Sequence, residues 1–296
     1  MASCEVEFDG YLLGASSDSI SRLRILNTSR FVGFGSPRVR QPATDRLAGG
    51  GHLGRASVEP RLFEAGTLLA SDWAVARNFA TSMYPSPGLL PLTFNGPAYP
   101  EKVIAFVSPQ GVSLPLDAEG QQKDVIHLVN ASWVAPDPTI YSASAFEETV
   151  VATEDPLNPP TVEWTNPGNI TPVHGVGEDA WIVDVEVLSG IGVGVTFFVD
   201  EFVDSTWVET GLVRVQSLLQ PGDKLSVGGD RIPRIIRDDT VTAAVAESYV
   251  NGVWVPQPFW PKFKPNVQSR VGVWANEFPG QGMSVEATMQ FRGTWG

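Results

Sequence analysis

The hydrophobic pattern at the start of the chain alternates with a period of two. In the segment CEVEFDGYLLG, apolar residues at Val6, Phe8 and Tyr11 alternate with polar residues around an Asp9-Gly10 pair. Alternation of this kind is typical of a strand with one buried face, and Asp-Gly is favoured in tight turns. The pattern therefore predicts that the chain begins with a β-hairpin.

One later segment, SDWAVARNFATSMYP, follows a helical period instead. Ser71 is a suitable N-cap, and Pro85 can end the helix. The apolar residues at helical spacing are Trp73, Ala76, Phe79 or Ala80, and Met83. We therefore expect an amphipathic helix whose Trp and Phe side chains pack in the core against a sheet.

Short apolar runs separated by turn clusters such as NPGN, QPGD and NEFPGQG fill the rest of the chain. Many short strands with few helices indicate β-sandwiches. Charge and proline content both shift just after PDPTIYSAS, which places the domain boundary there. The predicted fold class is mainly β, with two β-sandwich domains, 1–142 and 143–296, the first of which carries the helix.

Composition agrees with this fold class. The chain has 296 residues, of which 43% are hydrophobic and 18% charged, and it contains 29 Gly and 24 Pro. At about 150 residues per domain, the length accommodates about two folded domains. Abundant Gly, Pro and aromatic residues favour strands and turns over helices.

Charge is divided unevenly between the two halves. The net charge is −13, and counting residues gives −2 for 1–142 and −11 for 143–296, with no Lys or Arg from Asp124 to Val213. Binding to a nucleic-acid backbone needs clustered Lys and Arg, so we expect no specific nucleic-acid binding. The acidic surface is interpreted either as a solvated face, or as a surface that faces a basic partner, or as the lining of a passage to which DNA must not bind.

The basic residues of the first half gather in one glycine-rich stretch. We interpret the segment from Gly33 to Arg55 as a long, mobile arm or loop that becomes ordered against a partner. Arginine forms forked hydrogen bonds with carboxylates, which makes it well suited to such an interface. The proposed interface residues are Arg38, Arg40, Arg46 and Arg55.

Few residues suggest catalysis or cofactor binding. Cys4 is the single cysteine, and His52, His127 and His174 lack metal-ligand spacing. The sequence contains no G-x-S-x-G elbow, no apolar run long enough to span a membrane, and no visible secretory signal. We therefore expect a non-enzyme without cofactor, metal or membrane partner that is made in a cytoplasm.

Two alternatives remain open at this point. Acidic clusters at Asp179, Asp184 and Glu186, or at Asp200, Glu201 and Asp204, leave room for a cell-wall hydrolase with a carboxylate pair. Tryptophans on a β-sandwich surface leave room for a carbohydrate-binding, receptor-recognition protein. Most of the Trp side chains are nevertheless expected in the core or in interfaces.

Four stretches of this sequence resemble a known family, the distal tail proteins of long-tailed, non-contractile bacteriophages (siphophages). The first runs from PLTF to DPTIYSAS and contains an A-x-D-P-x-x-Y-S pattern; the second, LQPGDKLSV, spans Leu219 to Val227. The third is FWPKFKPNVQSRVGV, which lacks the family's glycine after proline. The fourth is MQFRGTWG, in which Phe291 replaces a tyrosine. The residues that match the family patterns of the first and third stretches are Ala135, Asp137, Pro138, Tyr141, Ser142, Phe263, Pro265 and Asn266.

The resemblance implies a structural virion protein at the tail tip, made in the host bacterial cytoplasm. It implies that the N-terminal sandwich, with its helix and arm, assembles six copies into a hub ring, and that the C-terminal sandwich is galectin-like. The implied partners are further copies of the chain, the tail tube protein and a tail tip or tail-associated protein. The tape measure and receptor-binding proteins are further candidates.

Overall fold

The structure is a computed structural model. It describes residues 5–14, 22–25, 31–33, 39–40, 43–45, 51–53, 57–66, 68–70, 73–84, 88–113, 126–171, 180–228, 232–256, 260–278 and 281–295. The chain divides into two compact units, Met1–Ser144 and Ala145–Trp295, which we call the first and second units. This division lies beside the boundary expected after residue 142.

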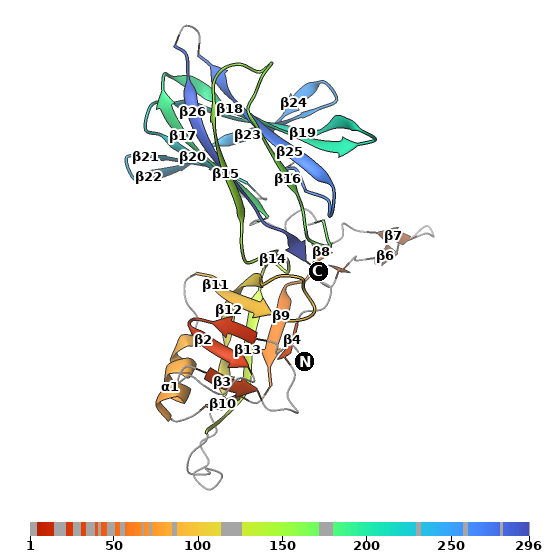
Figure 1. Ribbon diagram of the computed structural model, residues 1–296, viewed down its shortest axis with the longest axis vertical. Coiled ribbons are helices and arrows are strands. Elements are labelled where there is room, and N and C mark those ends of the chain that lie inside the picture. Colours follow the sequence, from red (N-terminus) through yellow and green to blue (C-terminus); the bar gives the residue numbers. More distant parts are fainter. Residues whose placement is uncertain are drawn as a thin grey trace. The chain divides into compact units, whose positions relative to one another are not determined.

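The first unit is built on one large sheet and a single described helix (Figure 1). Along the sheet the order is β14-β12-β11-β1-β2-β3-β10-β13-β9-β4. Its elements are β1 (Glu5–Phe8), β2 (Tyr11–Gly14), β3 (Arg22–Ile25), β4 (Phe31–Val32), β9 (Arg61–Ala65), β10 (Leu68–Ala70), α1 (Trp73–Ser82), β11 (Leu90–Asn95), β12 (Val103–Ser113), β13 (Ile126–Ala135) and β14 (Ile140–Ser142). Four shorter strands belong to the arm: β5 (Val39–Arg40), β6 (Ala43–Asp45), β7 (Gly51–Leu53) and β8 (Ser57–Val58).

The first hairpin of the sequence is confirmed, because β1 and β2 pair antiparallel around Asp9 and Gly10, which both adopt positive φ. The sheet then folds back on itself through strand β12. Residues Val103–Val107 of β12 pair with β11, whereas Ser108–Ser113 pair with β13 across register shifts around Gly111. One long strand therefore belongs to both layers of the sheet and encloses the core between them.

The helix packs against strands β10, β12 and β13 of this sheet. Val75, Ala76 and Phe79 are buried, and the ring of Phe79 meets that of Tyr11 edge to face at 5.4 Å. The expectation that Trp73 also lies in the core is wrong: its side chain is 41% exposed. Trp73 is the first residue of α1. Helix side chains point towards the N-terminus, so the side chain of Trp73 extends beyond the start of the helix.

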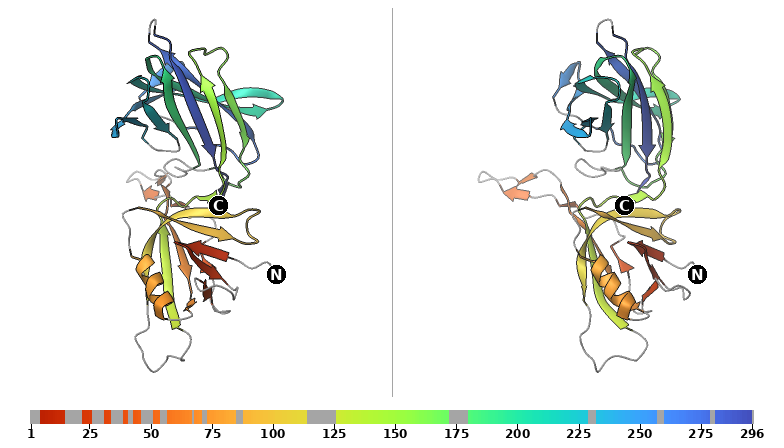
Figure 2. Two further views of the ribbon diagram at one scale, coloured as in Figure 1. Left: turned by 60° about the vertical axis from the view of Figure 1, so that its left-hand side comes forward. Right: turned by 90° about the vertical axis from the view of Figure 1, so that its left-hand side faces the viewer.

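The second unit contains two antiparallel six-stranded sheets, ordered β15-β26-β17-β20-β21-β22 and β16-β25-β18-β19-β23-β24. Figure 2 shows them as two layers facing each other. The strands are β15 (Phe146–Ala152), β16 (Thr161–Thr165), β17 (Trp181–Ser189), β18 (Gly192–Val203), β19 (Thr206–Leu219), β20 (Lys224–Val227), β21 (Arg234–Arg237), β22 (Thr240–Ala243), β23 (Val245–Val250), β24 (Val253–Val255), β25 (Gln268–Glu277), β26 (Ser284–Phe291) and β27 (Thr294–Trp295). The mainly β fold class and the sandwich architecture are confirmed, and a galectin-like character stays a prediction.

Aromatic side chains fill one end of the second unit. Trp164 stacks on Phe291 at 5.2 Å, and Trp181 meets Trp260 edge to face at 5.9 Å. The indole nitrogen of Trp181 donates a hydrogen bond to the carbonyl of Pro261 at 3.1 Å. These contacts satisfy the single polar atom of Trp181 while its rings are buried, as expected for tryptophans of the core.

A buried asparagine joins the segments beside this aromatic cluster. Asn166 Nδ2 donates to the carbonyl of Phe263 at 3.0 Å and to Thr294 Oγ1 at 2.9 Å. Its Oδ1 accepts hydrogen bonds from the backbone amides of Gly168 at 2.9 Å and Thr294 at 3.2 Å. Gly168 lies so close that a Cβ atom there would come within 1.9 Å of the Thr294 carbonyl. One amide side chain therefore holds three distant segments together.

We expect Asn166→Ala to lower the free energy of unfolding of the second unit by about 3 kcal/mol. The substitution leaves two buried backbone N–H donors without an acceptor, and each such group costs roughly 1–3 kcal/mol. Urea unfolding followed by tryptophan fluorescence measures the change.

Asn158→Ala is the matched control, because Asn158 is exposed and bonds only locally, to Asp155 at 3.1 Å. Its effect is expected to stay within about 0.5 kcal/mol. Equal effects of the two substitutions would contradict the role assigned to Asn166.

Candidate functional site: the arm of the first unit

The described strands between Phe31 and Ala65 pair antiparallel in three successive ladders. Phe31 pairs with Ala65 in β4 and β9, Val39 pairs with Val58 in β5 and β8, and the β6 and β7 pairs end at Asp45 opposite Gly51. In every one of these pairs the two residue numbers sum to 96 or 97, so the three ladders share nearly one register. The expected arm is therefore a paired two-stranded ribbon in its described parts, and the interpretation as a loop is wrong there.

A glycine marks the root of the arm, where β4 leaves the large sheet. Gly33 adopts φ +118°, and a Cβ atom at this position would lie 2.5 Å from the carbonyl oxygen of Leu62 and 2.7 Å from the ring of Phe63. Side chains other than glycine have neither the space nor the favoured conformation here. Glycine at this position therefore lets the chain leave β4 in close contact with β9.

Arg61, the first residue of β9, forms a hydrogen bond with the backbone at the root of the arm. Its side chain is buried, and Nη1 donates to the carbonyl of Gly33 at 3.4 Å. Burial lowers the pKa of Arg61, while a hydrogen bond with Tyr99 and the negative charge of Asp137 act in the opposite direction. A buried guanidinium requires such partners, because an unpaired charge in the interior is strongly unfavourable.

Asp137 belongs to the first of the four stretches, and it closes the turn between β13 and β14. One carboxylate oxygen accepts a hydrogen bond from the backbone amide of Thr139 at 2.9 Å, and the other accepts one from the hydroxyl of Tyr141. Tyr141 is buried, and Ser142 donates to Glu101. The A-x-D-P-x-x-Y-S pattern therefore describes a hydrogen-bonded turn whose aspartate also faces the arginine at the root of the arm.

Of the four predicted interface arginines, Arg40 lies in β5, opposite Ser57. Arg38, Arg46 and Arg55 lie outside the described residues. The role of all four in an interface stays a prediction.

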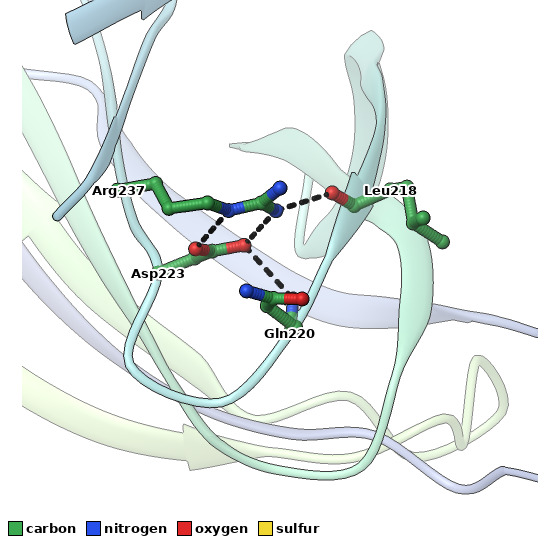
Figure 3. Close-up of polar contacts among 4 residues, drawn as sticks. All are labelled: Leu218, Gln220, Asp223 and Arg237. Carbon is green, nitrogen blue, oxygen red and sulfur yellow. Dashed lines mark hydrogen bonds and ion pairs between the residues drawn. The ribbon is translucent and has the colours of Figure 1, made fainter. Parts of the chain in front are cut away.

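The second stretch forms a turn between β19 and β20 that is held by Asp223 (Figure 3). The Asp223 carboxylate is buried and accepts two hydrogen bonds from Arg237, at 2.7 and 2.5 Å. It also accepts one from the backbone amide of Gln220 at 2.9 Å. Arg237 also donates to the carbonyl of Leu218 at 3.0 Å. These hydrogen bonds, above all those from Arg237, lower the pKa of Asp223.

The first acidic cluster considered for catalysis lies on the surface. Asp184 and Glu186 are exposed on β17, and Glu186 forms an ion pair with Lys224 at 3.5 Å. Asp179 lies outside the described residues. Exposed ion pairs of this kind contribute little to stability and are common on soluble sandwiches.

In the second acidic cluster, Asp200 and Glu201 form ion pairs with basic side chains, whereas Asp204 is exposed in the turn between β18 and β19. Asp200 is paired with Arg270 and Glu201 with Lys264, each at 2.6 Å. Because the two acids are neighbours on β18, their side chains point to opposite faces of the sheet, so they cannot flank one sugar ring as glycosidase carboxylates do. Burial and the charge of Asp200 raise the pKa of Glu209 on the adjacent strand.

Neither a metal centre nor a membrane-spanning helix is found in the described part of the chain. No group of three His, Cys, Asp or Glu side chains there is arranged to hold a metal ion. The described helix is too short to cross a bilayer.

No protein-family model and no curated protein sequence matches the chain. Among solved structures it is similar to the Dit protein of phage SPP1, described as a paradigm of the hub adsorption apparatus in phages that infect Gram-positive bacteria. That alignment covers 97% of this chain and 99% of the other, with 15% identity and a TM-score of 0.47. The chain is also similar to a chain of the phage p2 baseplate in its activated conformation with strontium, at 10% identity, 98% and 97% coverage and a TM-score of 0.43. The calcium form of that baseplate gives a TM-score of 0.39.

The clamp on Asp223 makes the stability of the second unit depend on pH. A carboxylate whose pKa is lower in the folded than in the unfolded state stabilises the fold above the unfolded value of about 3.9, and this contribution is lost as the pH falls through the folded value. We expect Asp223→Asn to cost about 2 kcal/mol at pH 7 and progressively less as the pH falls through the lowered folded pKa of Asp223, because protonation then removes the same charge from wild type.

Urea unfolding at several pH values measures this difference. Asp184→Asn removes the same charge from an exposed strand position and serves as the control. A pH-independent cost of Asp223→Asn would argue against the charged clamp.

Proposed function

We propose that the chain is a structural virion protein of a long-tailed, non-contractile bacteriophage. It forms a hub ring at the distal end of the tail, and this ring joins the tail tube to the tail tip and the host-adsorption apparatus. Six copies close the ring through the first unit, and the second unit serves as a scaffold or attachment module. The virion protein is made in the cytoplasm of the host bacterium.

The observation that carries this proposal is the structural role of the four resembling stretches. Asp137 closes one turn, Asp223 closes another, and the third and fourth stretches meet at Asn166. Each of these hydrogen-bonded junctions needs the acidic or amide side chain of a particular residue. Because residues of the resembling stretches have such structural roles, the resemblance reflects the architecture and is not an accidental match of short motifs. This supports the family resemblance at residues far apart in the sequence.

The arm supports a role in assembly. In its described parts the arm pairs as the two-stranded sheets β5–β8 and β6–β7, separate from the large sheet of the first unit, and its sequence is rich in arginine. The acidic surface that arginines require exists on every copy of the chain, because residues 143–296 carry a net charge of −11. Head-to-tail contact between identical copies gives a closed ring when the rotation permits closure.

Reconstruction of the assembled tail tests the proposal directly. We expect this chain to form a closed ring, with six copies, between the tube and the tip. The purified chain can remain monomeric until the particle nucleates the ring, so the assembled tail is the object to image. One or two copies per particle would contradict the hub.

The arm gives a second test. We expect simultaneous substitution of Arg38, Arg40 and Arg46 by Ala to weaken incorporation into tails at least tenfold while changing the melting temperature of the free chain by less than about 2 °C. We expect the arginines of the arm to contribute to contacts between copies and hardly to the fold of one copy. Complementation of tail assembly and thermal unfolding of the purified variant measure the two effects.

The matched control removes three exposed positive charges outside the arm, by substitution of Arg77, Lys224 and Arg234 with Ala. Its incorporation is expected to equal that of wild type. If both triple variants assemble alike, the arm is not the interface.

A further inference from the structure

One face of the β16-β25-β18-β19-β23-β24 sheet turns away from the core of the second unit and carries a row of chemically active side chains. Trp274 on β25 lies opposite Thr196 on β18, which lies opposite Arg214 on β19, which lies opposite Glu247 on β23. Residues directly opposite each other on adjacent strands share a face of the sheet. The row therefore crosses four strands on one face.

A groove of about 640 Å³ follows this row. Indole rings border it at two places: Trp274 on β25 and Trp254 on the edge strand β24, both half-buried. Four steps between strands separate β25 from β24, which is about 19 Å from strand to strand. The volume falls within the range of small-molecule sites, roughly 300–1,000 Å³, and the length fits a ligand of more than one ring.

Arg214 is held rigidly in the groove. Its Nε and Nη2 atoms contact one oxygen of Glu247 at 2.7 and 2.6 Å, and its guanidinium carbon lies 4.2 Å from the centre of the Trp254 ring. The carboxylate offsets the positive charge, and the indole fixes the plane of the guanidinium. The result is an oriented hydrogen-bond donor without net charge.

Other polar groups at the groove complete a set of donors and acceptors. Thr196 Oγ1 donates to Asn276 Oδ1 at 2.8 Å, which directs the amide nitrogen of Asn276 away from Thr196. That nitrogen and the exposed side-chain amide of Gln216 have no hydrogen-bond partner among the described residues. A side-chain amide that has a free N–H donor and a free carbonyl acceptor can form hydrogen bonds with two neighbouring hydroxyl groups of a ligand.

We propose that this groove binds a neutral oligosaccharide. Sugar rings present an apolar C–H face that stacks on indole and an edge of hydroxyl groups that bond to amides and guanidinium, which are the two kinds of group found here. An anionic ligand is disfavoured because the second half of the chain carries a net charge of −11 and Glu247 already neutralises the one cation in the groove. The proposal does not depend on the hub ring.

Titration of the full ¹⁵N-labelled chain with cellotriose, maltotriose and chitotriose tests the site, with a sulfated disaccharide as the anionic probe. The indole N–H signals of Trp254 and Trp274, assigned through Trp254→Phe and Trp274→Phe, are expected to shift with at least one neutral trisaccharide. A dissociation constant of about 1 mM or tighter is expected, so titration to about 10 mM reaches saturation. The sulfated probe is expected to leave these signals unchanged.

Trp274→Ala is expected to weaken binding at least tenfold. Because Trp274 also packs on Phe198 at 5.9 Å, Gln216→Ala provides a second variant that removes only an exposed side chain, with an expected loss of about threefold. Trp73→Ala, on the exposed start of α1, is the matched control and should bind as wild type does.

Three results would overturn the proposal. They are the absence of a shift with all three neutral trisaccharides, a stronger response to the sulfated probe than to any of them, and unchanged affinity in both groove variants.

Discussion

Side-chain acceptors that bind the backbone amides of their own turns are the interaction on which both units depend. Asp137 accepts from the amide two residues ahead, Asn166 does the same, and Asp223 accepts from the amide three residues behind. Asx side chains in such turns replace the strand partner that the amide lacks. All three side chains are buried or partly buried, so their hydrogen bonds are shielded from water. The bonds fix the turns that lie next to β14, β16 and β20. The positions of the sheets follow from these turns.

Much of the fold could be predicted from local pattern. Alternation around Asp9-Gly10 predicts the first hairpin, and the spacing from Ala76 to Met83 predicts the helix, because both patterns depend on neighbours in sequence. Trp73 could not be placed in the same way, since burial of a helix's first residue depends on what lies beyond its end. The sequence also did not predict that β12 belongs to two layers. The first half of β12 pairs with the preceding strand β11 and the second half with the following strand β13, and local pattern does not show which strands pair.

The sites were less accessible to sequence reasoning. The arm was expected from its arginines and glycines, yet its ladder was missed because only the tertiary register shows that residue pairs from Phe31 to Ala65 keep a nearly constant sum. The groove draws side chains from four strands, β18, β19, β24 and β25, and two of its residues, Thr196 and Trp274, lie far apart in sequence. Spacing carries no signal for such a set, whereas Asp200 and Glu201 are adjacent in sequence and yet face opposite sides of their sheet.

The paired arm has a consequence for the free chain. Each of its two short ladders, β5–β8 and β6–β7, is a two-stranded sheet by itself, so among the described residues both edges of each ladder are open. Open edges accept strands from other molecules and are a common origin of aggregation. Like charges along such an edge oppose uncontrolled pairing, and the sequence of this segment is rich in arginine. Screening those charges without providing a partner, for example with high salt, would therefore favour fibrous association over ordered assembly.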